Sequence, residues 1–237
     1  MKFYNLKNKL IILILLFSSS FSVLANTSMI PFHAEYQLFH GSKNLGSGYY
    51  KLEKLADGQF KMGYQSAGSW LFLEDIRTET SYFAWQDEKL QPHNYQMQRQ
   101  GSGPSFSANV KFIAADNKVL AQYKDSKVEH VWQGVLFDPL LYHLQLRLDV
   151  ESGKQDMHYQ VAYKTNLRDY HYKVVETELL ELTLGNYQAI KVERIRHPDS
   201  KKETLLWLIP ELNYVLGRVA HYENGDLKVN MVLDELQ

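Results

Sequence analysis

The chain has 237 residues, of which 45% are hydrophobic and 22% are charged; its formal net charge is −1, and it contains no cysteine. A nearly neutral chain has no generally basic surface, so its composition argues against a nucleic-acid partner. The absence of cysteine excludes disulfides, a cysteine nucleophile and the lipid-bearing cysteine of a bacterial lipoprotein.

The N-terminus has the pattern of a secretory signal peptide. Three lysines among the first nine residues precede an apolar run at 10–17, which is too short to cross a bilayer as a helix. Small residues then lead to Ala25, and we predict cleavage between Ala25 and Asn26. Residues 1–25 are therefore expected to be removed, and residues 26–237 to form a single domain. The sequence predicts a periplasmic protein that is neither a lipoprotein nor membrane-spanning.

Most of the remaining chain alternates apolar and polar residues with the two-residue period of half-buried strands. Residues 105–112, 157–163 and 227–233 show this pattern, and turn signals such as Asn224-Gly225 separate the runs. Counting the runs predicts roughly 11–14 strands, joined mainly as neighbours in a long antiparallel meander. So many twisted strands do not stay flat, and we expect them to curl into an open or half barrel.

One stretch, at about 138–150, has helical spacing instead. Asp138 is a good N-cap and Pro139 suits the first helical position. An apolar stripe follows, whereas residues such as His143 and Arg147 fall outside it on a helical wheel. We predict one amphipathic helix packed across the concave face of the sheet, either as a plug that fills the core or as a lid over a cavity. The stripe consists of Leu140, Leu141, Leu144 and Leu148.

Tyrosine is abundant, with 16 copies, and several occupy the apolar positions of predicted strands. A dry core favours aliphatic residues and phenylalanine, because each buried hydroxyl needs a partner. We therefore predict that Tyr159, Tyr163, Tyr170 and Tyr172, together with Leu144 of the helix, line a ligand-binding face. The alternative is that these tyrosines reflect only the preference of tyrosine for strands.

A basic turn at 194–202 is the second candidate site. Arg194, Arg196, Lys201 and Lys202 lie close together in the sequence RIRHPDSKK. They are predicted to contact an anionic group, such as a charged head group or a polyanionic glycan. The alternative is a solvated hairpin tip without a ligand.

No motif for catalysis or metal binding is present. The sequence lacks a complete serine-hydrolase elbow and a His-Glu-x-x-His motif. Gly46 and Gly48 precede strand-like residues instead of a phosphate-binding helix, and indicate a β-bulge or the start of a strand. His158 and His171 lie on the polar faces of neighbouring strands and are able to pair across them, but no metal site is predicted. We expect a non-enzymatic protein without a cofactor.

Five segments of the chain occur in a recognisable order: PFHAEYQLFHGSKNLGSGYYKL (31–52), LQPHNYQMQR (90–99), LFDPLLYHLQLRL (136–148), LGNYQAIKVERI (184–195) and LLWLIPELNYVLGRVAHYENG (205–225). Their order resembles the bacterial domain-of-unknown-function family 3108 over essentially the whole mature chain. The resemblance implies an exported, mainly β protein of unsettled function, and it supplies no catalytic residues.

Two functions remain in competition. The first is an envelope protein that binds a lipid-like ligand or a glycan on a concave β face; periplasmic lipoprotein carriers of the Lol type offer an analogy in fold only. The second is a structural or assembly factor that contacts an envelope protein partner through a sheet edge or an exposed patch. An outer-membrane barrel is disfavoured, because residues 190–196 carry charges on both strand faces.

Overall fold

The computed structural model describes residues 29–70 and 73–237, so the predicted signal peptide and the Ala25–Asn26 cleavage site lie outside the described residues. Within the described ranges, the strands form one fifteen-stranded sheet that is accompanied by a single α-helix. The prediction of a mainly β fold with one helix is therefore confirmed.

The strands fall into two groups along the chain. The first group comprises β1 (Phe32–His40), β2 (Lys43–Lys54), β3 (Phe60–Trp70), β4 (Leu73–Gln86), β5 (Lys89–Gly101), β6 (Phe106–Ile113), the 3-10 turn η1 (Ala114–Asp116), β7 (Lys118–Tyr123) and β8 (Ser126–Val131). The second comprises β9 (Leu136–Phe137), the helix α1 (Leu141–Glu151), β10 (Asp156–Tyr163), β11 (Asn166–Leu182), β12 (Gly185–Ile195), β13 (Lys202–Ile209), the 3-10 turn η2 (Pro210–Leu212), β14 (Val215–Glu223) and β15 (Asp226–Leu236).

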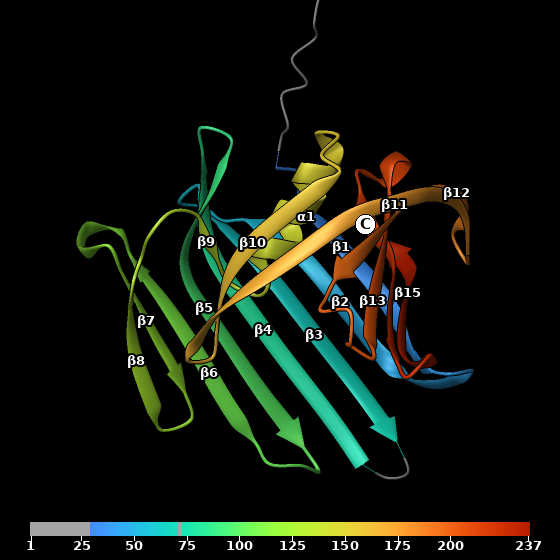
Figure 1. The fold of residues 1–237 in the computed structure, drawn as a ribbon, viewed down its shortest axis with the longest axis horizontal. Helices are drawn as coiled ribbons and strands as arrows, with labels where there is room; N and C mark the ends of the chain where they lie inside the picture. The colour runs from blue at the N-terminus through green and yellow to red at the C-terminus, as the bar shows by residue number, and fades with distance from the viewer. Residues whose placement is uncertain (1–28, 71–72) are drawn as a thin grey trace, which may run out of the picture.

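Each group is an antiparallel meander, and the two meanders join where β1 pairs with β15. The first and last strands therefore lie side by side in the middle of the sheet, and its two free edges are β8 and the two-residue β9, which pairs in parallel with β10. Figure 1 shows the sheet curving around α1, with β3–β5 on one side of the helix and the β10–β11 pair on the other. The sheet is open, as predicted.

A β-bulge in β2 explains the early glycine pair. Leu38 pairs with Gly46 and Phe39 pairs with Asn44, so Leu45 is the extra residue of the bulge. Gly46 adopts φ +144°, and a Cβ atom at this position would lie 2.1 Å from the carbonyl oxygen of Ala67 on β3. Glycine is therefore required here by both the backbone conformation and the close approach of the next strand.

We expect Gly46→Ala to lower the free energy of unfolding by about 1–3 kcal/mol, because alanine is strained at this φ and collides with a backbone atom. Urea denaturation followed by circular dichroism measures the change. Gly41→Ala is the matched control, since Gly41 also has positive φ but has open space around its Cβ position. An equal loss in both variants would show that the close contact with Ala67 contributes nothing.

The helix begins slightly later than predicted, but Asp138 does cap it. The regular α-helix starts at Leu141, and a turn precedes it. Asp138 Oδ1 accepts hydrogen bonds from the backbone N–H groups of Leu140 (2.9 Å) and Leu141 (3.0 Å). The hydroxyl of Ser81 on β4 donates to Asp138 Oδ2 at 2.6 Å, which attaches the start of the helix to the sheet. No helix in the described ranges is both long and apolar enough to cross a membrane.

The buried surface of α1 is wider than one apolar stripe. Three of the four predicted leucines are buried, and Leu148 is only partly buried. Leu146 and Arg147, which lie outside the predicted stripe, are buried as well. The Arg147 guanidinium lies 5.2 Å from the centre of the Phe32 ring, so the prediction that this residue faces away from the core is wrong. The reason is the curvature of the sheet, which encloses the helix from several sides instead of supporting it from one.

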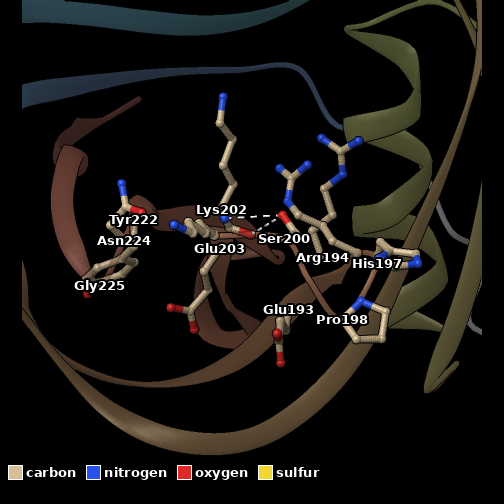
Figure 2. Close-up of a pocket in the computed structure, with 12 residues that line it drawn as sticks. Glu193, Arg194, His197, Pro198, Ser200, Lys202, Glu203, Tyr222, Asn224 and Gly225 are labelled. Carbon is tan, nitrogen blue, oxygen red and sulfur yellow. Dashed lines mark hydrogen bonds between the residues drawn. The ribbon is translucent and has the colours of Figure 1, made fainter.

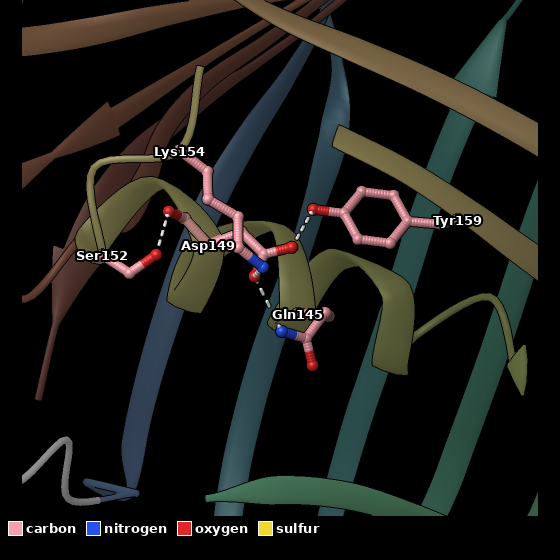
Figure 3. Close-up of polar contacts among 5 residues, drawn as sticks. All are labelled: Gln145, Asp149, Ser152, Lys154 and Tyr159. Carbon is pink, nitrogen blue, oxygen red and sulfur yellow. Dashed lines mark hydrogen bonds and ion pairs between the residues drawn. The ribbon is translucent and has the colours of Figure 1, made fainter. Parts of the chain in front are cut away.

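The C-terminal end of α1 is fixed by Asp149 (Figure 3). Its carboxylate accepts hydrogen bonds from Tyr159 Oη (2.8 Å), Lys154 Nζ (2.6 Å) and Gln145 Nε2 (3.0 Å), and its carbonyl oxygen accepts one from Ser152 Oγ. Tyr159 belongs to β10, so this hydrogen bond joins the helix to the second meander. Hydrogen bonds to charged groups are among the stronger ones in proteins, and both ends of the helix are thus held by a buried carboxylate.

Candidate ligand-binding site

A basic pocket opens where β12 ends, β13 begins and β14 meets its turn to β15 (Figure 2). Its volume is about 600 Å³, within the range of small-molecule sites. All four predicted basic residues line it, together with His197 and the hairpin residues of β14–β15. The predicted residues are Arg194, Arg196, Lys201 and Lys202.

The positive charges of the basic pocket are only partly neutralised. Arg194 lies 3.9 Å from the ring centre of Tyr170, and Arg196 donates to the hydroxyl of Thr204 at 3.0 Å. Among the described residues, neither arginine forms an ion pair, whereas Lys202 lies 3.5 Å from Glu223. In Figure 2, Arg194 and Lys202 extend to one side of the pocket, with Arg194 nearer the helix, while Glu193 and Glu203 point to the opposite side. The arrangement can therefore accept an anion.

An inner cavity of about 170 Å³ lies beside the basic pocket, between α1 and strands of both meanders. Tyr172 and Arg194 lie opposite each other in the β11–β12 pairing and so share the inner face of the sheet. Arg194 lines both the basic pocket and the inner cavity. The complete lining is Leu38, Tyr50, Tyr64, Tyr142, His143, Tyr172, Arg194, Thr204, Leu206, Val219, His221, Val229 and Met231.

Two histidines of the inner cavity are held neutral. Burial lowers the pKa of His143 to about 3, and the nearby His221 and Arg194 act in the same direction. Burial also lowers the pKa of His221, which hydrogen-bonds the Thr204 hydroxyl at 2.9 Å. His143 Nδ1 is buried and has no hydrogen-bond partner among the described residues. At neutral pH the positive charge of the site therefore comes from its arginines and lysines.

A side groove of about 560 Å³ extends the inner cavity along the sheet. The two spaces share Leu38, Tyr64, His221 and Val229, and the groove continues past Leu45 and Leu73 along the end of β3 and the start of β4. Its lining is more apolar than that of the basic pocket. An elongated ligand would thus meet the basic pocket at one end, then the tyrosine-rich inner cavity, and beyond it a groove in which aliphatic residues alternate with Glu74, Asp75, Arg77 and Arg99.

The predicted ligand-binding residues separate into two sets. Tyr172 lines the inner cavity, and the ring of Tyr170 lies under the Arg194 guanidinium. Tyr159 is buried with its hydroxyl bound to Asp149, and Tyr163 lies at the other end of the strand pair, where the Arg168 guanidinium stacks at 4.4 Å from its ring centre.

Leu144 faces elsewhere. Its side chain is only 2% exposed, and it borders a void of about 30 Å³ between α1 and the first strands instead of the inner cavity. That space corresponds to little more than one water molecule. The geometry of Leu144 is that of a core residue.

Sequence reasoning missed several residues of the inner cavity. Tyr50, Tyr64 and His221 come from strands that are distant in sequence, and no local pattern connects them. The helical wheel puts His143 outside the apolar stripe, yet His143 lines the inner cavity because the sheet also encloses that side of the helix. Only Thr204 and His221 gave a weak indication in the sequence. They are polar residues at inward strand positions, where buried polar groups require hydrogen-bond partners, and they bond each other.

Residues 60–232 match the model of DUF3108, a protein family of unknown function. The chain belongs to this family. The match covers most of the second meander and all but the first two strands of the first, and so includes the basic pocket. No curated protein matches the DUF3108 chain in sequence.

Two solved structures resemble this DUF3108 protein. A β-barrel-like protein of the domain of unknown function DUF1849 from Brucella abortus aligns with a TM-score of 0.60 and 12% identity, over 88% of this chain and 97% of that chain. At this identity the similarity concerns the fold alone. A protein with a YmcC-like fold from Bacteroides fragilis aligns with a TM-score of 0.35 and 11% identity, over 87% of this chain and 95% of that chain, and no inference rests on it.

Proposed function

We propose that this DUF3108 protein is a non-catalytic binding protein of the cell envelope that holds an amphipathic ligand. The anionic group of the ligand occupies the basic pocket, and its less polar part follows the inner cavity and the side groove. The predicted signal peptide supports a periplasmic location. Lipid-like molecules and amphipathic glycans with a phosphate or carboxylate group have the required chemistry.

One observation carries the proposal: Arg194 lines both the basic pocket and the inner cavity. A guanidinium that has no carboxylate partner in the described ranges, and that lies on a tyrosine ring, offers donors to an anion while its stacking keeps it in place. The charged and the tyrosine-lined spaces therefore meet at a single side chain, which is the arrangement that an amphiphile requires.

We expect Arg194→Ala to weaken binding of dodecyl phosphate at least tenfold, because hydrogen bonds to a charged group contribute about 1.5–3 kcal/mol. Isothermal titration calorimetry below the micellar concentration measures the affinity, and dodecanol serves as the uncharged probe. The matched control is Arg168→Ala, which removes another arginine that is stacked on a tyrosine, outside the basic pocket.

The expected pattern is a loss for Arg194→Ala, little change for Arg168→Ala and weak binding of dodecanol to all three proteins. Equal affinity for dodecyl phosphate in wild type and Arg194→Ala would refute the proposed position of the anionic group. Equal losses in both variants would indicate general surface attraction.

A second function is favoured by the exposed edge of the sheet. The free edge strand β8 and its surroundings expose Leu120, Val128, Val131 and Val135, and such an edge is able to pair with a strand of another protein. This geometry suits an envelope assembly factor. Native mass spectrometry of protein purified from periplasm separates the two proposals: a stoichiometric lipid or glycan supports the binding protein, whereas a bound protein with no small molecule supports the assembly factor.

A further inference from the structure

A cluster of metal-ligating side chains lies on the convex face of β10 and β11, away from the basic pocket. His158 pairs directly with His171, and Asp156 pairs with Lys173 at the next position on the same face. The intervening Met157 and its partner Tyr172 have the opposite strand parity and point inward. The pairing runs without a register shift from Asp156 to Tyr163, so a regular two-stranded backbone presents the cluster.

The three side chains already converge. Asp156 Oδ1 lies 2.8 Å from His171 Nε2 and 3.1 Å from His158 Nε2. The two imidazole rings stack with centres 4.0 Å apart, and one ligand atom from each residue lies within 4.8 Å of the others. The prediction that these histidines pair across the strands is met by this geometry, while the aspartate supplies a third donor that the sequence did not reveal.

We propose that Asp156, His158 and His171 form a binding site for a divalent transition-metal ion of the zinc type. Two imidazole nitrogens and one carboxylate oxygen are a frequent donor set for Zn²⁺, at distances of about 2.0–2.2 Å. Donor atoms around such an ion are about 3.4 Å apart, so the carboxylate oxygen must move away from the two imidazole nitrogens by roughly half an ångström. The stacked rings must also rotate so that the in-plane lone pairs of both nitrogens point to the ion. The remaining coordination positions are open to water or to a ligand from outside the chain.

Exposure and charge define the character of the site. The His158 side chain is 72% exposed and that of Asp156 48%, so an ion reaches them from solvent without any opening of the fold. Lys173 Nζ lies 3.2 Å from Asp156 Oδ2 and competes with a cation for the carboxylate. This geometry describes an exchangeable surface site, in contrast to a buried structural one.

Titration of untagged protein with Zn²⁺ by isothermal calorimetry tests the site. We expect one ion per chain, and at least a tenfold loss of affinity in His158→Ala and in His171→Ala, since each removes one of three ligands. His197→Ala is the matched control: His197 also faces an aspartate, Asp199, at 3.3 Å, but no third metal-ligating side chain of the described residues joins this pair. Circular dichroism checks that each variant is folded.

A gain-of-affinity variant makes the test independent of any damage to the fold. Lys173→Met removes the competing ammonium group and should increase Zn²⁺ affinity severalfold, because a like charge near the ion is lost. Co²⁺ substitutes for Zn²⁺ as a spectroscopic probe. Its visible absorption spectrum in the site should differ from that of wild type in His158→Ala and not in His197→Ala. Unchanged Zn²⁺ affinity in both histidine variants of the cluster, or an equal loss in His197→Ala, would overturn the proposal.

Discussion

Replacing Asp138 by alanine should lower the free energy of unfolding by about 3–5 kcal/mol at pH 7. The change removes the acceptor of two buried backbone N–H groups and of the Ser81 hydroxyl, and each unsatisfied buried group costs about 1–3 kcal/mol. Urea denaturation followed by circular dichroism measures the loss. Asp138→Asn is the matched control, because its side-chain oxygen still accepts from the helix and its NH₂ group is able to donate to Ser81.

The same two variants have a distinctive pH dependence. Burial raises the pKa of Asp138 from 3.8 to about 7, although its three hydrogen-bond donors lower it. The native state therefore binds this proton more tightly than the unfolded state does. The stabilisation is fully present below about pH 4 and is lost as the pH rises to about 7, with a magnitude on the order of 4 kcal/mol. Asp138→Asn lacks this contribution at every pH.

His143 acts in the opposite direction over nearly the same interval. Its native pKa of about 3 lies below the usual 6.5, so its contribution to stability is present above about pH 6.5 and is lost as the pH falls toward 3. In wild type the two contributions offset each other between about pH 4 and 6.5. We expect Asp138→Asn to become more stable with rising pH in this interval, and His143→Gln to become less stable. Parallel pH profiles for wild type and both variants would contradict this assignment.

Leu144→Ala should lower the free energy of unfolding by about 2–5 kcal/mol, because the side chain is almost fully buried and its removal enlarges an existing void. The affinity for dodecyl phosphate should remain unchanged, since Leu144 does not line the inner cavity or the basic pocket. Chemical denaturation and calorimetry measure the two quantities. Leu148→Ala, at a partly buried position of the same helix, should cost less.

This experiment also separates a plug from a lid. A small stability loss in Leu144→Ala, combined with weaker ligand binding, would show that the leucine covers a ligand and that the helix acts as a lid. The full core-type loss with unchanged binding would identify α1 as a plug. The structure favours the plug, because carboxylates fix both ends of the helix and the sheet surrounds it.

Local patterns were sufficient to predict the strands, the helix and the open sheet. The two-residue period assigns a face to strand residues between the β-bulges, and Asp138-Pro139 marks the start of the helical segment. The count of 11–14 strands fell short of the observed fifteen, and β9, with only two residues, is too short to show a periodic pattern.

The candidate site depended more on information that a local pattern does not contain. The four predicted tyrosines share one face of the sheet, yet only Tyr170 and Tyr172 lie near Arg194. The two-residue period fixes the face to which a side chain points, but not its position along the sheet. His143 enters the inner cavity only because strands far away in sequence wrap around α1. Contacts between distant segments, such as the pairing of β1 with β15, determine which residues meet, and a single sequence does not specify them.

The position of β1 and β15 at the centre of the sheet has a consequence for the order of folding. His33 and Gln237 exchange two backbone hydrogen bonds of 2.9 Å, so the two meanders are joined by segments that are about 200 residues apart in the sequence. Contacts of such long sequence separation form late, because the entropy of closing a large loop opposes them. During synthesis, which proceeds from the N-terminus, one edge of β1 therefore stays unpaired until β15 is available. During that time this edge is open to strands of other molecules.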